Sequence, residues 1–281
     1  MHKMIYLKNT IKTLLILLVT ILFLSCKTEK PSEIIVIGNL HKPAPNYNPE
    51  ILFNILENVK PDFILHEVDS SFFTADFKFN KPYNENEGMA SKMYIEKYPA
   101  TKLRPYEFEG RNQYRRDKGM RPTDRLTLRL LDSLNKANML TSEQSEIFNT
   151  YQALIEPLKV RAAKSPKHFN NPQTDSICEQ RQYFQYQMVP KITNARSEFA
   201  TRFLIKPNGE KISYRDGYQL WANFWDTRNQ TMAKNIMKIA QLNKGKRFVV
   251  LTGFMHRYYL LKELKKLTKG ENIILKEFYD K

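Results

Sequence analysis

The fold is decided by residues 33–41, which read Glu-Ile-Ile-Val-Ile-Gly-Asn-Leu-His, together with residues 247–256, which read Arg-Phe-Val-Val-Leu-Thr-Gly-Phe-Met-His. In each stretch an apolar run passes directly into a Gly-x-x-His sequence. Short continuous apolar runs are typical of strands buried on both faces, as in parallel sheets covered by helices. We therefore expect a strand in each stretch, with a histidine just beyond its carboxyl end.

The residues after the first strand indicate a strand–helix–strand unit. Asn48-Pro49-Glu50 supplies a helix cap, a first-turn proline and a first-turn acid, which predicts a helix to about Val59. Pro61-Asp62 ends that helix, and Phe63 to Val68 is a second apolar run of strand length. Two strands joined by a helix are parallel and have a right-handed crossover.

The remainder of the chain has helical periodicity in the middle and strand signals at the end. We expect helices from about 123 to 237, and then a strand at 247–252, a helix at about 256–267 and a strand at 272–278. The fold class is therefore α/β: a mostly parallel sheet built from both ends of the mature chain, carrying a helical insertion. One domain at 33–281, with the insertion at about 108–212, fits this length.

The first 25 residues are interpreted as a signal peptide. Lys3, Lys8 and Lys12 precede the apolar run Leu14–Leu24, which is too short to span a bilayer stably. The run ends in Leu-Phe-Leu-Ser-Cys26, which resembles a bacterial lipoprotein cleavage site. We expect lipidation at Cys26 with fatty chains such as palmitate, a tether at 26–32 and a place in the bacterial cell envelope, outside the cytoplasm. An ordinary signal with an incidental cysteine is the alternative.

Composition excludes several classes of protein. The 281 residues include 42% hydrophobic and 12% aromatic residues, which argues against disorder, and two Cys are too few for a disulfide scaffold or a cysteine-based zinc site. The 45 Lys and Arg exceed the 29 Asp and Glu, but they are scattered along the chain. We therefore expect no nucleic-acid partner; anionic lipid, polysaccharide or simply solvent would face these residues.

Three strand ends carry ionisable groups, and these form the predicted site. Ligands of parallel sheets bind beyond the carboxyl ends of the strands, where His41, Glu67 and His256 should converge. His256 lies in the first turn of its helix, whose positive end favours a neutral imidazole. Hydrogen-bonded turn residues without chemistry are the alternative for either histidine alone. His66 should face away from Glu67 and pack in the core.

Further candidates come from periodicity. Arg228 falls on the apolar stripe of a predicted helix, where a guanidinium normally pairs with a carboxylate or a bound anion, and Asn229 lies beside it. Glu107 follows a short extended stretch and could reach the same edge of the sheet, although its sequence favours a surface turn. We assign Asn229 and Glu107 to substrate binding.

Taken together, the two Gly-x-x-His motifs, Glu67, and Arg228-Asn229 resemble the superfamily of TraB/PrgY and Tiki proteins, erythromycin-esterase-like enzymes and ChaN. The resemblance covers about 34–68 and 225–267. It implies a hydrolase-like fold with one site made by both histidines and the glutamate, metal-dependent in Tiki-like proteases and without a clear metal requirement in erythromycin-esterase-like enzymes. Asn39 and Met255 depart from the smaller residues usual in the family.

The leading hypothesis is a membrane-tethered hydrolase of protease or esterase type acting on a small molecule or peptide. His41, Glu67, His256 and Arg228 would be catalytic, and His41, Glu67 and His256 would hold one divalent metal, Mn, Co or Zn, if one binds. The alternative is a haem- or ligand-binding lipoprotein of ChaN type, with Tyr258 or Tyr259 as axial ligand. A non-catalytic surface component that keeps only the fold is the third interpretation.

Overall fold

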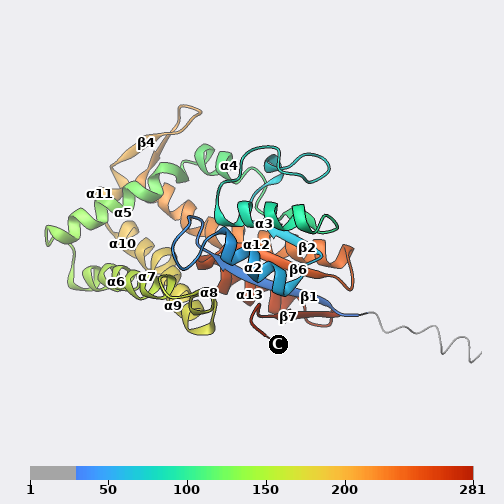
Figure 1. Cartoon of the computed structure of the whole chain (residues 1–281). Helices are drawn as coiled ribbons and strands as arrows, with labels where there is room; N and C mark the ends of the chain where they lie inside the picture. Colours follow the sequence, from blue (N-terminus) through green and yellow to red (C-terminus); the bar gives the residue numbers. More distant parts are fainter. Residues whose placement is uncertain (1–29, 281) are drawn as a thin grey trace, which may run out of the picture.

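A five-stranded sheet forms the centre of the computed structural model, which describes residues 30–280 (Figure 1). Its strands, in spatial order, are β3 (Lys102–Pro105), β2 (Phe63–His66), β6 (Arg247–Gly253), β1 (Ser32–Asn39) and β7 (Ile273–Lys276). All neighbouring strands are parallel. The predicted α/β class with a sheet built from both ends of the chain is confirmed, and the short extended stretch expected before Glu107 is β3, an edge strand of this sheet.

The strand order brings the two Gly-x-x-His motifs together. The unit predicted from residues 33 to 68 does contain parallel strands, but β6 lies between β1 and β2 and pairs with both. In the β1–β6 ladder Gly38 is opposite Thr252, and Asn39 is opposite Gly253. The two motifs therefore follow adjacent strands, and their glycines are offset by one residue in the register of this strand pair.

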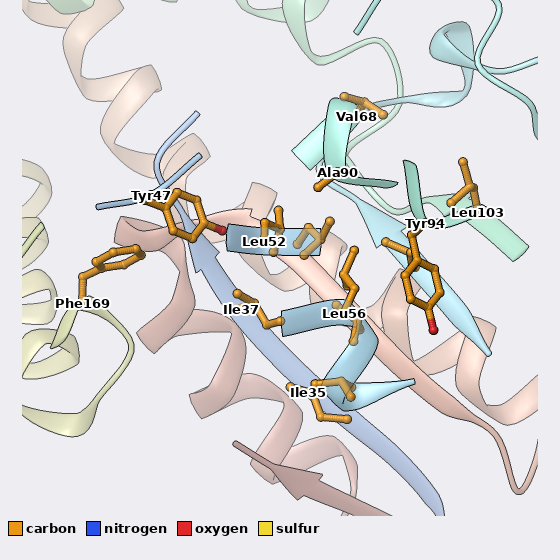
Figure 2. Packing of buried hydrophobic residues seen from close by; sticks show 14 of the residues in the cluster. Ile35, Ile37, Tyr47, Leu52, Leu56, Val68, Ala90, Tyr94, Leu103 and Phe169 are labelled. Atoms are coloured by element: carbon orange, nitrogen blue, oxygen red, sulfur yellow. The ribbon is translucent and has the colours of Figure 1, made fainter. Parts of the chain in front are cut away.

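Alternate residues of each strand bury against different helices. Ile35, Ile37 and Leu251 face α2 (Pro49–Val59) and α3 (Asn86–Lys97), in the cluster drawn in Figure 2. Their neighbours along the strands face α12 (Tyr214–Leu242) and α13 (Phe254–Leu267). α2 begins as predicted, because the Asn48 side chain accepts a hydrogen bond from the Ile51 amide. Both faces of the sheet are thus covered, which explains why its strands are continuously apolar.

The region between β3 and α12 is mostly helical, and Figure 1 shows it to one side of the sheet. A 3₁₀ turn at Ser70–Phe72 precedes it. Its elements are α4 (Arg111–Asp117), α5 (Met120–Lys136), α6 (Ser142–Ala153), α7 (Ile155–Ala162), α8 (Pro166–Phe169), α9 (Pro172–Tyr183), a π-helical turn at Phe184–Met188, α10 (Val189–Ala195), α11 (Ser197–Ala200), and the hairpin of β4 (Phe203–Ile205) and β5 (Lys211–Ser213). The hairpin and the π turn are not among the elements expected from the sequence.

One long helix joins the insertion to the sheet. α12 has 29 residues, so it is about 43 Å long at 1.5 Å per residue. Its first half packs with the insertion through Tyr218, and its second half packs on the sheet through Met232 and Ile236. Arg228 and Asn229 lie between these two contacts, where the sheet edge meets the insertion.

The predicted signal peptide and Cys26 lie outside the described residues. β1 begins at Ser32, one residue before the strand expected from Glu33. From residue 30 to residue 280, the helices are all too short or too polar to cross a lipid bilayer.

Candidate functional site

The two Gly-x-x-His motifs are in contact, and their glycines make the contact possible. A Cβ on Gly38 would lie 2.8 Å from the Cα of Phe254, and a Cβ on Gly253 would lie 3.0 Å from Nε2 of His41. The same position on Gly253 is 3.8 Å from the His256 ring. Close approach between the two motifs is therefore what requires glycine at both positions. The histidines from opposite ends of the chain meet beside Gly253.

The backbone that carries His41 is held by two buried asparagines. Asn170, from the insertion, accepts from the Gly38 amide at 2.6 Å and donates to the Gly38 carbonyl at 3.0 Å. Asn86, the first residue of α3, donates from its backbone to the His41 carbonyl at 2.9 Å and from its side chain to the Leu40 carbonyl at 2.6 Å. The loop after β1 is thus fixed from both sides.

His41 is paired with two carboxylates. Its Nδ1 lies 2.5 Å from Oε1 of Glu87, which is buried, and 3.4 Å from Oε2 of Glu85, which is 49% exposed. Hydrogen bonds to Glu85 and Glu87 raise the pKa of His41 to about 10, although burial opposes this. At neutral pH His41 is therefore an imidazolium that donates from Nδ1 to the glutamates and has a second N–H at Nε2.

His256 has the opposite protonation state. Its ring stacks on Trp225 with centroids 4.4 Å apart, and burial lowers its pKa to about 3. Nη1 of Arg228 donates to its Nε2 at 2.7 Å, so the ring proton is on Nδ1, which donates to Oδ1 of Asn229 at 2.7 Å. Both nitrogens of the neutral imidazole are thus engaged by α12.

Arg228 is the centre of the buried network. It donates from Nη2 to Oε1 of Glu67 at 2.5 Å and from Nε and Nη2 to both oxygens of Glu107, at 2.5–3.1 Å. Glu107 also accepts from Arg111 at 2.8 Å. Burial would lower the pKa of Arg228, but the two carboxylates raise it above its ordinary value.

The side chain of Glu67, 8% exposed, follows β2 directly and contacts Arg228 of α12. His66 packs on the other side of the sheet, against Phe79 and Tyr83, as expected. Oε2 of Glu67 accepts from the Thr252 hydroxyl at 2.6 Å and from the Gly253 amide at 2.8 Å. Burial alone would raise the pKa of Glu67, but attraction to His256 and Arg228 outweighs it and holds the pKa well below the usual range. Because His256 is neutral, we assign the ionised carboxylate chiefly to Arg228.

The predicted metal ligands are not arranged for a shared ion. Both nitrogens of His256 are already hydrogen-bonded, and Glu67 is held by Arg228, Thr252 and the Gly253 amide. Within residues 30–280, the group of three His, Cys, Asp or Glu side chains whose ligand atoms lie within 4.8 Å of one another is His41, Glu85 and Glu87. In that group, Oε2 of Glu87 is buried and has no hydrogen-bond partner.

Two residues assigned to substrate binding have other contacts here. Glu107 is 4% exposed and is held by Arg228 and Arg111, and Asn229 is fully buried between His256 and the Trp225 carbonyl. Both position other site residues in this arrangement. The sequence reading missed Glu85 and Glu87; the signal for Glu87 is its place on the buried stripe of α3, where it precedes Ala90 and Tyr94 at helical spacing.

A cavity of about 590 Å³ opens between the sheet edge and the insertion. His41, Gly253 and His256 form one wall, and Arg181, Gln182 and Tyr186, from α9 and the π turn, form part of the other. Tyr258 and Tyr259, the axial ligands of the haem alternative, line a neighbouring cavity and are not among the residues that line this one.

Comparison with family models, curated proteins and solved structures found no match for this chain.

Proposed function

We propose that this protein is a hydrolase that cleaves an ester or peptide bond in the cavity lined by His41 and His256, called the histidine cavity below. Its lipidated Cys26 would tether it to a bacterial membrane on the side away from the cytoplasm. The observation that carries the proposal is the meeting of His41 and His256, from opposite ends of the chain, at one cavity wall backed by the Arg228 network. Perturbed, buried ionisable groups that converge on a cavity are typical of catalytic sites.

His41 would transfer the proton. Its imidazolium is held at Nδ1 by Glu87, and its Nε2 lies next to Gly253 in the cavity wall. From Nε2 it would donate a hydrogen bond to the developing oxyanion and a proton to the leaving group. Glu85, the exposed carboxylate 3.4 Å from Nδ1 of His41, does not line the cavity, so it would accept the proton of the attacking water through a second, bridging water.

Arg228 and His256 would provide a fixed electrostatic environment. The guanidinium is held by Glu67 and Glu107, so it need not reorganise when negative charge develops nearby. Neutral His256, locked by Arg228 and Asn229, contributes shape and polarity to the wall without titrating near neutral pH. In this proposal His41 and Glu85 exchange protons, and the other members position them.

The resemblance implies a divalent metal in some relatives, and the residues fit such an ion at His41, Glu85 and Glu87. One imidazole nitrogen and two carboxylates are suitable donors for Mn²⁺, Co²⁺ or Zn²⁺, and the unpartnered Oε2 of Glu87 could serve as a further donor. A bound ion there would lower the pKa of a coordinated water and supply the nucleophile. The set His41, Glu67 and His256 does not fit, because both nitrogens of His256 and both oxygens of Glu67 are engaged elsewhere.

The test is an ester and peptide substrate screen on residues 27–281, with His41→Ala as the variant and His168→Ala as the matched control. His168 is exposed and contacts only Ser165 through its ring. We expect His41→Ala to lose roughly 10²- to 10⁴-fold in kcat/KM and the control to keep full activity. Equal activity of the two variants would refute the catalytic role.

Metal binding has its own test. Chelated protein is titrated with Mn²⁺, Co²⁺ or Zn²⁺ by calorimetry, comparing Glu87→Gln with Glu96→Gln, an exposed position on the same helix. Heat release that Glu87→Gln abolishes and Glu96→Gln keeps supports the metal site. The absence of heat release from the unaltered protein would refute the metal site. A Soret band on titration with haemin would instead favour the ligand-binding alternative.

A further inference from the structure

The residues that line the histidine cavity include no carboxylate. Thirteen residues line it, and they include Lys42 and Arg181 in addition to the two histidines, but no Asp or Glu. The four glutamates near the site lie outside this lining, and each is paired with His41 or Arg228. Their ion-pair partners are His41, Arg228 and, for Glu107, also Arg111, so none of the four is paired with Lys42 or Arg181.

Arg181 is held in place by neutral groups. Its Nη1 donates to Oε1 of Gln185 at 3.0 Å, its Nη2 donates to the hydroxyl of Tyr151 at 2.9 Å, and its guanidinium lies 4.8 Å from the centre of that ring. Within the part of the chain that the structure describes, no carboxylate lies within 4.0 Å of Arg181 or of Lys42. Arg181 is thus oriented but keeps its full charge, which is the arrangement of an anion-binding guanidinium.

Gln182 also indicates a ligand, one that carries a hydrogen-bond donor. It lines the same cavity, it is only 4% exposed, and its Oε1 is buried with no hydrogen-bond partner. A buried acceptor without a donor is costly, so such groups usually receive a hydrogen bond from a bound molecule or water. Arg181 and Gln182 lie in the last turn of α9, just before the π-helical turn, a distortion that is frequent at functional sites.

We propose that the substrate is an anion, bearing a carboxylate or a phosphate that the helical insertion recognises through Arg181, and that Oε1 of Gln182 accepts a hydrogen bond from an O–H or N–H group of the same molecule. Lys42, exposed at the cavity, adds a second positive charge. The apolar side chains of Leu40, Phe254 and Met255 in the same lining would contact the uncharged part of the molecule. This inference rests on the proposed function and names its substrate class.

The test measures binding and does not depend on turnover. The chain has two tryptophans, so Trp221→Phe leaves Trp225, in the cavity wall, as the only indole reporter. Hexanoate, hexyl phosphate, 1-hexanol and hexylamine are titrated into the chain without its signal peptide, carrying Cys26→Ser. Arg181→Gln and Lys42→Gln are compared with Arg125→Gln, an exposed arginine of α5 with no side-chain partner given by the structure.

We expect both anions to bind roughly tenfold or more tightly than the alcohol and the amine, as for one charge-assisted hydrogen bond. Arg181→Gln should remove most of this preference while the affinity for 1-hexanol stays the same, and Arg125→Gln should change nothing. Lys42→Gln, at an exposed site, keeps the test decisive if Arg181→Gln does not fold. The tighter of the two anions identifies carboxylate or phosphate as the substrate group.

Equal binding of all four probes, no binding of any probe, or an anion preference that survives both variants would overturn the inference. The proposed function fails separately. Hydrolysis by His41 without anion preference would leave the enzyme and remove only the substrate class. Anion binding without any hydrolysis would leave an anion-binding cavity and remove the enzyme.

Discussion

Arg228→Met removes the cation at the centre of the buried network while keeping a long side chain. Glu67 and Glu107, the two carboxylates that it contacts, have side chains only 8% and 2% exposed. Glu107 keeps Arg111 as a partner, but Glu67 keeps only the hydrogen bonds from Thr252 and the Gly253 amide. The variant therefore leaves buried negative charge without its main counter-ion.

Removing one partner of a buried ion pair costs about 3–5 kcal/mol of unfolding free energy. For a chain of this size, that is a fall in Tm of roughly 6–20 °C. The cost depends on pH. In the native protein the pKa of Glu67 is lowered, so its contribution is present above the ordinary pKa of 4.5 and is lost as pH falls through the lower folded value.

In the variant, Arg228 no longer outweighs the effect of burial on Glu67, so the pKa of Glu67 should rise above its ordinary value. The folded variant then gains stability by taking up a proton, and its deficit relative to the native protein should narrow between pH 7 and about pH 5. Urea unfolding followed by far-ultraviolet circular dichroism, at both pH values, measures this directly.

Two comparisons make the measurement decisive. Arg125→Met, at an exposed position of α5, controls for the loss of an arginine. A triple variant adds Glu67→Gln and Glu107→Gln to Arg228→Met, which removes the unpaired buried carboxylates. We expect the control to be near-neutral and the added substitutions to restore part of the stability. A cost for Arg228→Met within about 0.5 kcal/mol of the control, or a deficit that grows on acidification, would refute the reasoning.

Three further predictions concern the loop that carries His41. In chelated protein, an NMR titration should give His41 a pKa of about 10, and Glu87→Gln should lower that pKa. Because the folded pKa is above the ordinary value of 6.5, the stability that this pair contributes is complete below pH 6.5 and is lost as the pH rises to about 10. An unshifted pKa of His41 would contradict the pairing. Gly253→Ala would place a Cβ 3.0 Å from Nε2 of His41, so kcat/KM should fall while the circular dichroism spectrum is unchanged; full activity would show that the contact is not required. Asn170→Ala leaves the amide and carbonyl of Gly38 unpaired and should cost about 1–3 kcal/mol in urea unfolding, whereas no cost would mean that water replaces the side chain.

The chemistry of the site depends on partners that lie far away in the sequence. The sequence alone indicated that His256 would be neutral, but not that Arg228 and Asn229, 28 and 27 residues earlier, would engage both of its nitrogens. Likewise, Glu87 contacts His41 across 46 residues, and nothing in the local spacing around either residue signals that contact. Position on a helix stripe indicates that a side chain is buried, but not which group it meets.

The sequence by itself determined the strands at 33–37, 63–66 and 247–252 and the start of the helix at Asn48-Pro49-Glu50, because hydrophobic periodicity and capping are local properties. It did not predict the β4–β5 hairpin or the π-helical turn. Only the tertiary structure decided that β6 lies between β1 and β2, that Gly38 and Gly253 allow the two motifs to touch, and that the insertion supplies Arg181 and Gln182 to the cavity. Strand order and cavity walls depend on long-range packing among whole elements, and that packing is not encoded in the spacing of neighbouring residues.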